Sequence, residues 1–294
     1  MGVLVPLSTF NSKTYIGKVI LSFAVFIGGY GIFLSATSIS ITTGQNQYQE
    51  NRLKAEKYIF KQPSCVGLIL GSSLSDGLKE EYFDGSVCNL AFGGGSSLWG
   101  GALAMALPQR PQVVLIEANV LVDVNQEFLN ALLGDPDYSL KKMSPIFLQA
   151  SQPVTQLLNW LRQKNPPKAK TLDPEQVETW VKYYTEAYNQ FGEGEQKMFQ
   201  KSFKALEKLI NEMKTAGIKI IFFQMPTDLR LKESKKMRWE QEQWSRFAQQ
   251  NQISFLQLPF APEMKTKDGL HLEDSSLKSL APMLLMALRA QIRH

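Results

Sequence analysis

The sequence predicts an α/β protein, a three-layer α/β/α sandwich around a five-stranded parallel sheet, preceded by one N-terminal transmembrane helix. After residue 62, strand-like apolar runs alternate with helical stretches, which is typical of an open α/β sheet. The strand-like runs are nearly continuous, as expected for parallel strands that are covered on both faces. With 294 residues, of which 44% are hydrophobic, the chain is long enough to form one large domain.

An uncharged apolar segment near the start predicts the membrane helix. No charged residue occurs from 19 to 49, and the most apolar part is 19–36. A span of about 20 such residues crosses the hydrocarbon core. The alternative is a cleavable signal peptide, whose apolar region is only about 7–15 residues long. We expect 1–18 to be a cytoplasmic tail, 19–43 an uncleaved transmembrane helix and 44–62 a linker, either a stalk or a short helix that leads into the domain.

The orientation of this helix depends on two opposing signals. Positive charges after the helix outnumber Lys13 and Lys18 before it, which alone would favour an external amino terminus. However, long downstream domains translocate largely regardless of charge, and Lys18 directly precedes the apolar run. We therefore expect a single-pass protein of the cytoplasmic (inner) membrane with a periplasmic domain.

The domain at 63–294 contains five strand-like and five helical segments. Strands are predicted at 65–71, 87–92, 112–118, 217–224 and 253–258, and helices near 97–107, 173–191, 195–215, 233–250 and 274–292. Gly217 lies just past the third helix and is a good stop signal. Residues 120–172, rich in proline turns, interrupt the alternation and predict an insertion, which usually shapes a pocket rim or a partner contact.

Cys65 and Cys88 open the first two predicted strands. If these strands pair in parallel, the two residues could come within disulfide range, and an extracytoplasmic location would let the bond persist. The alternative is a pair of buried free thiols. Two cysteines and one internal histidine cannot build a typical zinc site, so we expect no metal and no cofactor.

The charge pattern bears on the partners. The net charge of +5 is mild, and no arginine-rich block or aromatic–basic alternation occurs, which argues against nucleic acid. Such a charge would suit an anionic envelope polymer or lipid surface, although it is more often a solvated surface without specific meaning.

Three residues supply the groups of a nucleophile–base–orienter relay. His271 is the only histidine inside the chain, and Asp268 precedes it by three residues. Ser73 follows the first strand, where open α/β sheets place their sites, and is our nucleophile; Ser72 and Ser75 compete with it. The structural alternative for the Gly-Ser-Ser turn is helix capping.

Four blocks carry a resemblance to a known family. They read Gly71-Ser72-Ser73-Leu74, Asn89-Leu90-Ala91-Phe92-Gly93-Gly94-Gly95-Ser96, Glu117-Ala118-Asn119-Val120 and Asp268-Gly269-Leu270-His271. In this order they resemble the SGNH, or GDSL-like, hydrolase superfamily, which has a flavodoxin-like sandwich. The resemblance implies Ser73, Asp268 and His271 as catalytic residues. It also implies the Ser73 amide, Gly94 and Asn119 as oxyanion donors, with Gly93 or Gly95 as alternatives to Gly94.

Two departures from the family pattern are informative. Ser72 replaces the usual aspartate, and Glu117 with Val120 replaces the usual glycine and final acidic residue. These changes resemble membrane-anchored branches, including the D-alanyl-lipoteichoic-acid transfer protein and alginate O-acetylation proteins. The resemblance implies a membrane-anchored serine esterase or O-acyltransferase.

The expected substrates are acyl, chiefly acetyl, esters of an envelope polysaccharide or another acylated glycan. An acyl-enzyme would form on Ser73, and a multipass acyltransferase could be a partner. The alternative is a non-catalytic assembly or scaffold protein of an envelope polysaccharide system. The altered third block and the insertion favour that alternative.

Overall fold

A five-stranded parallel sheet forms the centre of the protein, with the strand order β2-β1-β3-β4-β5. The computed structural model describes residues 12–36, 46–61, 65–164, 172–261 and 264–292. The strands are β1 (Gly67–Leu70), β2 (Val87–Asn89), β3 (Val113–Glu117), β4 (Lys219–Gln224) and β5 (Ser254–Gln257). The predicted fold class is therefore confirmed.

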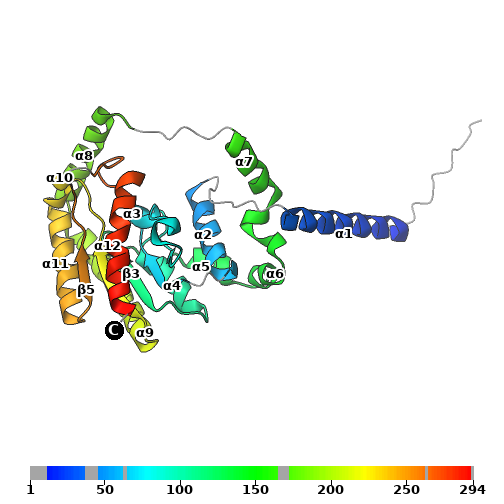
Figure 1. The fold of residues 1–294 in the computed structure, drawn as a ribbon, viewed down its shortest axis with the longest axis horizontal. Helices are drawn as coiled ribbons and strands as arrows, with labels where there is room; N and C mark the ends of the chain where they lie inside the picture. The colour runs from blue at the N-terminus through cyan, green and yellow to red at the C-terminus, as the bar shows by residue number, and fades with distance from the viewer. Residues whose placement is uncertain (1–11, 37–45, 62–64, 165–171, 262–263, 293–294) are drawn as a thin grey trace, which may run out of the picture.

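Two apolar cores cover the two faces of the sheet. All residues of β1 and β3 are buried, and alternate residues along each strand enter different cores. Leu68 and Leu70 pack in the core formed with α4 (Ser97–Ala106), α9 (Glu193–Thr215) and α11 (Lys235–Gln250), whereas Ile69 packs in the core formed with α12 (Asp274–Ile292). These helices form the two outer layers of a three-layer sandwich, and Figure 1 labels them around the strands. Because both faces are covered, the strands read as continuous apolar runs in the sequence.

The helices of the sandwich follow the predicted segments closely. They are α4 (Ser97–Ala106), α8 (Pro174–Asn189), α9 (Glu193–Thr215), α11 (Lys235–Gln250) and α12 (Asp274–Ile292). Shorter helical turns are α3 (Ser73–Asp76), η1 (Glu80–Phe83) and α10 (Leu229–Lys232). Gly217 follows α9 with a φ of 75°, a left-handed conformation that glycine adopts without strain.

The insertion between β3 and β4 is largely helical. It comprises α5 (Gln126–Leu133), α6 (Asp137–Met143), η2 (Pro145–Phe147), η3 (Gln149–Ser151) and α7 (Pro153–Lys164). The last part of the predicted insertion, 165–171, lies outside the described residues. In Figure 1, α6 and α7 lie on the side of the domain nearest α1 (Ser12–Ala36), and α5 lies beside α2 (Gln47–Lys61).

Helix α2 (Gln47–Lys61) lies within the segment expected to be a linker. Its residues Ala55 and Ile59 are buried in the core shared with α4 and α9. Part of the expected linker is therefore packed against the domain.

Helix α1 (Ser12–Ala36) precedes the domain and extends away from it in Figure 1. Its stretch Lys13–Leu34 is 22 residues long and apolar enough to cross a membrane, by length and composition. The helix begins at Ser12 rather than at Val19, and residues 37–43 of the expected span lie outside the described residues.

Cys65 and Cys88 form a disulfide, with their Cα atoms 5.6 Å apart. Leu68 lies opposite Cys88 in the parallel pairing of β1 with β2, and the chain just before β1 brings Cys65 to the Cys88 side chain. The bond joins the chain just before β1 to the edge strand of the sheet.

Candidate active site

Ser73, His271 and Asp268 come together at the carboxyl end of β1. Ser73 begins α3 directly after this strand, and the other two residues lie in the loop before α12. His271 Nε2 lies 2.9 Å from Ser73 Oγ, and His271 Nδ1 lies 2.8 Å from Asp268 Oδ2. All three side chains are partly exposed. The structure therefore brings together the three residues that the sequence singles out for the relay.

The loop around His271 holds Asp268 in a fixed orientation. Asp268 Oδ1 accepts hydrogen bonds from the amides of Leu270 (3.0 Å) and His271 (2.8 Å), which leaves Oδ2 for the imidazole. Gly269 has a φ of 91°, and a Cβ at this position would lie 2.5 Å from the Val181 side chain. The tight turn of Asp268-Gly269-Leu270-His271 thus depends on glycine.

The pKa of Asp268 lies below its ordinary value. Burial alone would raise this pKa, but the hydrogen bonds from the ring and amide of His271, the charge of His271 and the Leu270 amide together outweigh that effect. The carboxylate therefore stays ionised in the neutral range, as a group that stabilises a protonated imidazole must.

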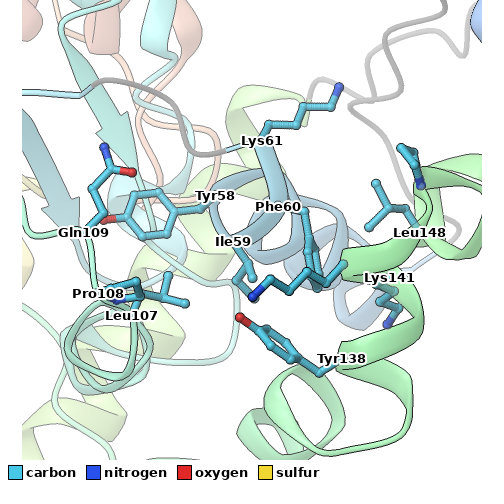
Figure 2. A pocket seen from close by; sticks show the side chains of 12 residues that line it. Tyr58, Ile59, Phe60, Lys61, Leu107, Pro108, Gln109, Tyr138, Lys141 and Leu148 are labelled. Atoms are coloured by element: carbon cyan, nitrogen blue, oxygen red, sulfur yellow. The ribbon is translucent and has the colours of Figure 1, made fainter.

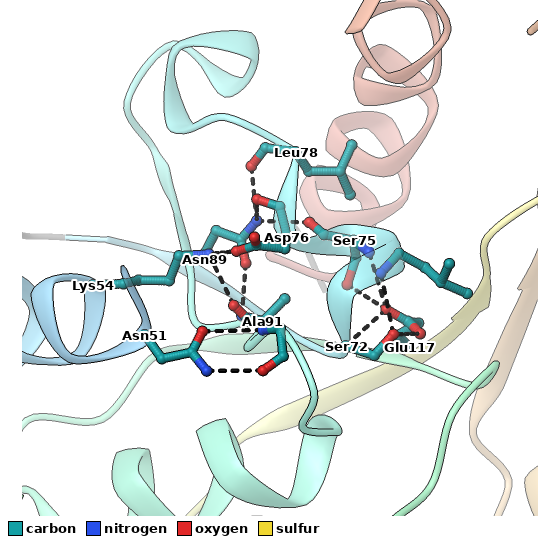
Figure 3. Close-up of polar contacts among 11 residues, drawn as sticks. Asn51, Lys54, Ser72, Ser75, Asp76, Leu78, Asn89, Ala91 and Glu117 are labelled. Atoms are coloured by element: carbon teal, nitrogen blue, oxygen red, sulfur yellow. Dashed lines mark hydrogen bonds and ion pairs between the residues drawn. The ribbon is translucent and has the colours of Figure 1, made fainter. Parts of the chain in front are cut away.

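A second carboxyl group lies on the buried side of the same turn. Glu117 ends β3 and accepts hydrogen bonds from the amides of Ser72 (3.0 Å) and Ser75 (3.2 Å). It also accepts from the hydroxyl of Ser72 at 2.6 Å and from that of Ser75 (Figure 3). Sequence reasoning noted Glu117 only as a departure from the family pattern. The signal available was one acidic residue at the end of an otherwise apolar strand.

This network distinguishes Ser73 from its competitors. The hydroxyls of Ser72 and Ser75 both donate to Glu117, whereas the Ser73 hydroxyl contacts His271. The amides of Ser72 and Ser75 also donate to Glu117, and the amide of Leu74 donates to Ser72 Oγ at 3.2 Å. In the described part of the chain, the Ser73 amide has no hydrogen-bond acceptor, so it remains able to donate to a substrate oxygen.

The pKa of Glu117 is raised. Complete burial of the carboxyl is the largest cause, and the four hydrogen bonds from Ser72 and Ser75 oppose it only in part. Glu117 and Asp268 therefore have pKa values shifted in opposite directions.

The three glycines after β2 differ in how their amides are used. The Gly93 amide donates to Asn51 Oδ1 at 3.0 Å, and the Gly95 amide donates to the Phe92 carbonyl at 3.0 Å. Gly94 is exposed, has a φ of 70°, and its amide has no partner among the described residues. Of the three, Gly94 is thus the one whose amide has no partner among the described residues.

Asn89 and helix α2 connect this glycine loop to the serine turn, as Figure 3 shows. Asn89 Nδ2 donates to the carbonyls of Ser75 and Leu78, both at 2.8 Å, while its Oδ1 accepts from the Ala91 amide. Lys54 on α2 donates to the Ala91 carbonyl and forms an ion pair with Asp76. The two loops that carry the free amides are therefore held in one hydrogen-bonded unit.

Asn119 lies two residues beyond β3, at the same edge of the sheet. Its Nδ2 donates to the Met225 carbonyl at 2.9 Å, and its Oδ1 accepts from the Met225 amide at 2.7 Å. Within the described residues, no hydrogen bond links Asn119 to Ser73, Asp268 or His271. The side-chain amide carries a second N–H, which the bond to Met225 does not use.

A separate cavity of about 250 Å³ lies near the amino-terminal ends of the strands (Figure 2). Its lining includes Tyr58 and Lys61 from the end of α2, and Leu107 and Gln109 from the loop before β3. These residues come before strands, whereas Ser73 follows a strand. Because the strands are parallel, the two sets lie at opposite ends of the sheet, so the cavity is remote from the triad. Lys141, which also lines it, is paired with Glu56 at 2.8 Å.

Comparison with known proteins gives limited likeness. No family model matches the chain, and no curated protein matches it. A solved structure from Bacteroides fragilis, assigned as an acylhydrolase, shares 12% identity at a TM-score of 0.41, over 76% of this chain and 86% of that one. A GDSL-like lipase from Bacteroides thetaiotaomicron shares 11% identity at a TM-score of 0.41, over 83% and 98%. Likeness at this level assigns neither family nor activity.

Proposed function

We propose that the protein is a membrane-anchored serine esterase or O-acyltransferase that forms an acyl-enzyme on Ser73. The observation that carries the proposal is the continuous relay from Ser73 Oγ through the His271 ring to Asp268, with contacts of 2.9 and 2.8 Å. The four sequence blocks support placing the protein in the SGNH superfamily. The same contacts count against the non-catalytic scaffold, because a scaffold needs no relay.

In the first half of the reaction, Ser73 Oγ attacks the carbonyl carbon of an ester while its proton passes to His271 Nε2. Asp268 accepts the Nδ1–H bond and stabilises the imidazolium. The amides of Ser73 and Gly94 and the second N–H of Asn119 would stabilise the negative oxygen of the tetrahedral intermediate. When the intermediate collapses, His271 returns the proton to the leaving alcohol, and the acyl group stays on Ser73.

In the second half, an acceptor hydroxyl attacks the acyl-enzyme. His271 takes the proton of that hydroxyl, and the new intermediate collapses with return of a proton to Ser73 Oγ. Water as acceptor gives a free acid, which is esterase activity. A sugar hydroxyl as acceptor gives a new ester, which is acyl transfer.

We further propose that the substrate is an acylated, chiefly acetylated, glycan of the cell envelope. The apolar helix α1 supports anchoring in the inner membrane, and the disulfide between Cys65 and Cys88 supports an oxidising, extracytoplasmic location for the domain. The departures at Ser72 and Glu117 support a membrane-anchored branch of the superfamily, such as those of D-alanyl-lipoteichoic-acid transfer or alginate O-acetylation. In such a system a multipass acyltransferase would supply the acyl group.

Labelling with a fluorophosphonate tests the nucleophile. The wild-type protein should be labelled on Ser73 and should hydrolyse a chromogenic acetate ester, whereas Ser73→Ala should do neither. Ser75→Ala, which removes a competing hydroxyl, should still be labelled. Equal labelling of the wild type and Ser73→Ala would refute the assignment.

A second experiment separates hydrolysis from transfer. The full-length protein in detergent is incubated with an acetylated glycan, with and without an unacetylated acceptor glycan. Release of acetate favours the esterase, and acetate appearing on the acceptor favours the transferase; Ser73→Ala is the blank. If Ser73→Ala restores glycan modification in cells that lack the gene, the scaffold alternative is favoured instead.

A further inference from the structure

Helix α7 exposes an apolar face to solvent. Val154, Leu157, Trp160 and Leu161 have exposed fractions of 59, 55, 48 and 42%. Their spacing of three and four residues places them on one side of the helix. Four large apolar side chains therefore form a continuous stripe along the outside of the insertion.

The inner side of α7 is mostly polar, with Leu158 as a half-buried apolar residue. Thr155 is buried and accepts a hydrogen bond from Gln49 of α2 at 3.2 Å. Gln156 donates to the Ala150 carbonyl at 2.9 Å, and Asn159 Nδ2 is buried without a partner among the described residues. A surface helix of a globular protein shows the opposite arrangement, with the apolar side inward. The polarity of α7 is therefore inverted.

An inverted helix is stable on a protein surface when an apolar medium covers its outer face. Apolar patches that stay contiguous and exposed mark sites for partners or membranes. The tryptophan also has a basic neighbour: the Lys164 ammonium lies 3.9 Å from the centre of the Trp160 ring. Tryptophan and lysine together are typical of residues at the membrane–water interface.

The position of α1 indicates what covers α7. Tyr30, four residues before the end of the apolar span at Leu34, donates a hydrogen bond to the Ser151 carbonyl, two residues before α7 begins. Tyrosine near the end of a membrane helix lies at headgroup level. Figure 1 shows α7 beside this end of α1. The chain from Ala36 to Gln47 can extend by at most about 40 Å, so α2 and the domain stay close to the membrane.

We propose that α7 lies on the lipid bilayer that α1 spans, with its apolar stripe in the boundary between headgroups and acyl chains and Lys164 among anionic headgroups. The inference rests on the proposed membrane insertion of α1 and is independent of the chemistry at Ser73. Two contacts with the bilayer, through α1 and α7, prevent the domain from rotating freely about α1. The Ser73 site is thereby held in one orientation relative to the membrane surface.

Tryptophan quenching by brominated lipid tests this contact directly. The full chain is reconstituted in vesicles of phosphatidylglycerol and phosphatidylcholine, the latter brominated in the upper part of one acyl chain. Bromine quenches tryptophan only on close approach, so Trp160→Phe should lose most of the lipid-dependent quenching. Trp180→Phe is the matched control, because Trp180 is 43% exposed on α8, far from α1 in Figure 1, and should leave the quenching unchanged.

A charge placed on the stripe provides a second test. Leu157→Asp should lower the lipid-dependent quenching of Trp160 by about twofold or more, because a carboxylate opposes burial in the acyl region. Met198→Asp, at a position 72% exposed on α9, should not change it. Both variants should hydrolyse a soluble acetate ester at the wild-type rate.

Other outcomes would overturn the proposal. If Trp160→Phe and the wild type are quenched equally, α7 does not contact lipid, and a protein partner becomes the better occupant of the stripe. If alkaline carbonate removes the full chain from the vesicles, α1 is not inserted and the proposal fails with it. Fluorophosphonate labelling of the same samples reports on the triad separately, so neither result is confused with failure of the proposed chemistry.

Discussion

The two sides of the Ser73 turn use carboxyl groups in opposite ways. On the exposed side, Asp268 is half-buried, and its pKa is lowered despite burial because hydrogen bonds to His271 outweigh desolvation. On the buried side, Glu117 is fully enclosed, and its pKa is raised because desolvation outweighs the bonds from Ser72 and Ser75. Asp268 stabilises the positive charge that His271 acquires during the reaction, whereas Glu117 fixes backbone amides and hydroxyl groups that stay in place. The predictions below separate these two roles.

Removing the base on the exposed side should have the largest effect. His271→Ala leaves Ser73 without a proton acceptor, so kcat/KM for a chromogenic acetate ester should fall by about 10⁴-fold or more. Steady-state kinetics of the detergent-solubilised full chain measure this effect. His294→Ala, which changes the only other histidine, is the control and should retain wild-type activity. Retained activity in His271→Ala would exclude the relay.

Neutralising the orienting carboxyl should have the next largest effect. In Asp268→Asn the amide keeps one oxygen but loses the charge that stabilises the imidazolium, so kcat should fall by about 10⁴-fold, and no further than in His271→Ala. Asp84→Asn is the control, since Asp84 pairs with Arg289 and lies in the turn after η1. If Asp268→Asn and Asp84→Asn behave alike, Asp268 has no part in orienting His271.

Disturbing the buried side should reduce the rate less. Glu117→Gln replaces one acceptor oxygen by an NH₂ group that faces the donors of Ser72 or Ser75, so the turn should shift and kcat should fall by about tenfold with little change in KM. Glu240→Gln is a matched control, because Glu240 is a buried glutamate on α11 whose pKa is raised to about 7. It should alter stability without altering kcat. A parallel loss of stability and unchanged kcat in Glu117→Gln would assign Glu117 a purely structural role.

The exposed side could be predicted from the sequence because its signals are local. Asp268 and His271 lie in one turn, and Ser73 follows a strand that reads as a continuous apolar run. The role of Glu117 could not, because it depends on the register between β1 and β3. Leu70 lies opposite Ile116 in that register, which brings the next residue, Glu117, under the serine turn. No pattern within a single segment contains that information.

The same distinction applies to the fold. All five strands and the five sandwich helices were predicted, because apolar periodicity reports burial against a sheet. The linker segment is compatible with a short helix, but the packing of α2 into the domain is not visible in the sequence, because its polar residues Gln49 and Asn51 bind other segments. The helices of the insertion were not predicted, and α7 reverses the usual polarity. Periodicity identifies a helix but not the medium that covers its apolar face.

The smallest predicted effect is a pair of opposite pH dependences of stability. Asp268 has a lowered pKa, so its contribution to the free energy of unfolding is present above about pH 4 and is lost on further acidification. Glu117 has a raised pKa, so folding favours its protonated form, and its contribution is lost as the pH rises from about 4 through the raised pKa. Urea unfolding of the full chain in detergent, followed by circular dichroism, measures both.

The free energy of unfolding of the wild type minus that of Asp268→Asn should therefore rise with pH. The free energy of unfolding of the wild type minus that of Glu117→Gln should fall with pH. Each difference isolates one carboxyl, because other titrating groups are common to both proteins. A difference from Glu117→Gln that rises with pH would mean that the four donors of Ser72 and Ser75 outweigh desolvation. The pKa values of the two carboxyl groups would then be shifted in the same direction, and the contrast between them would be one of position alone.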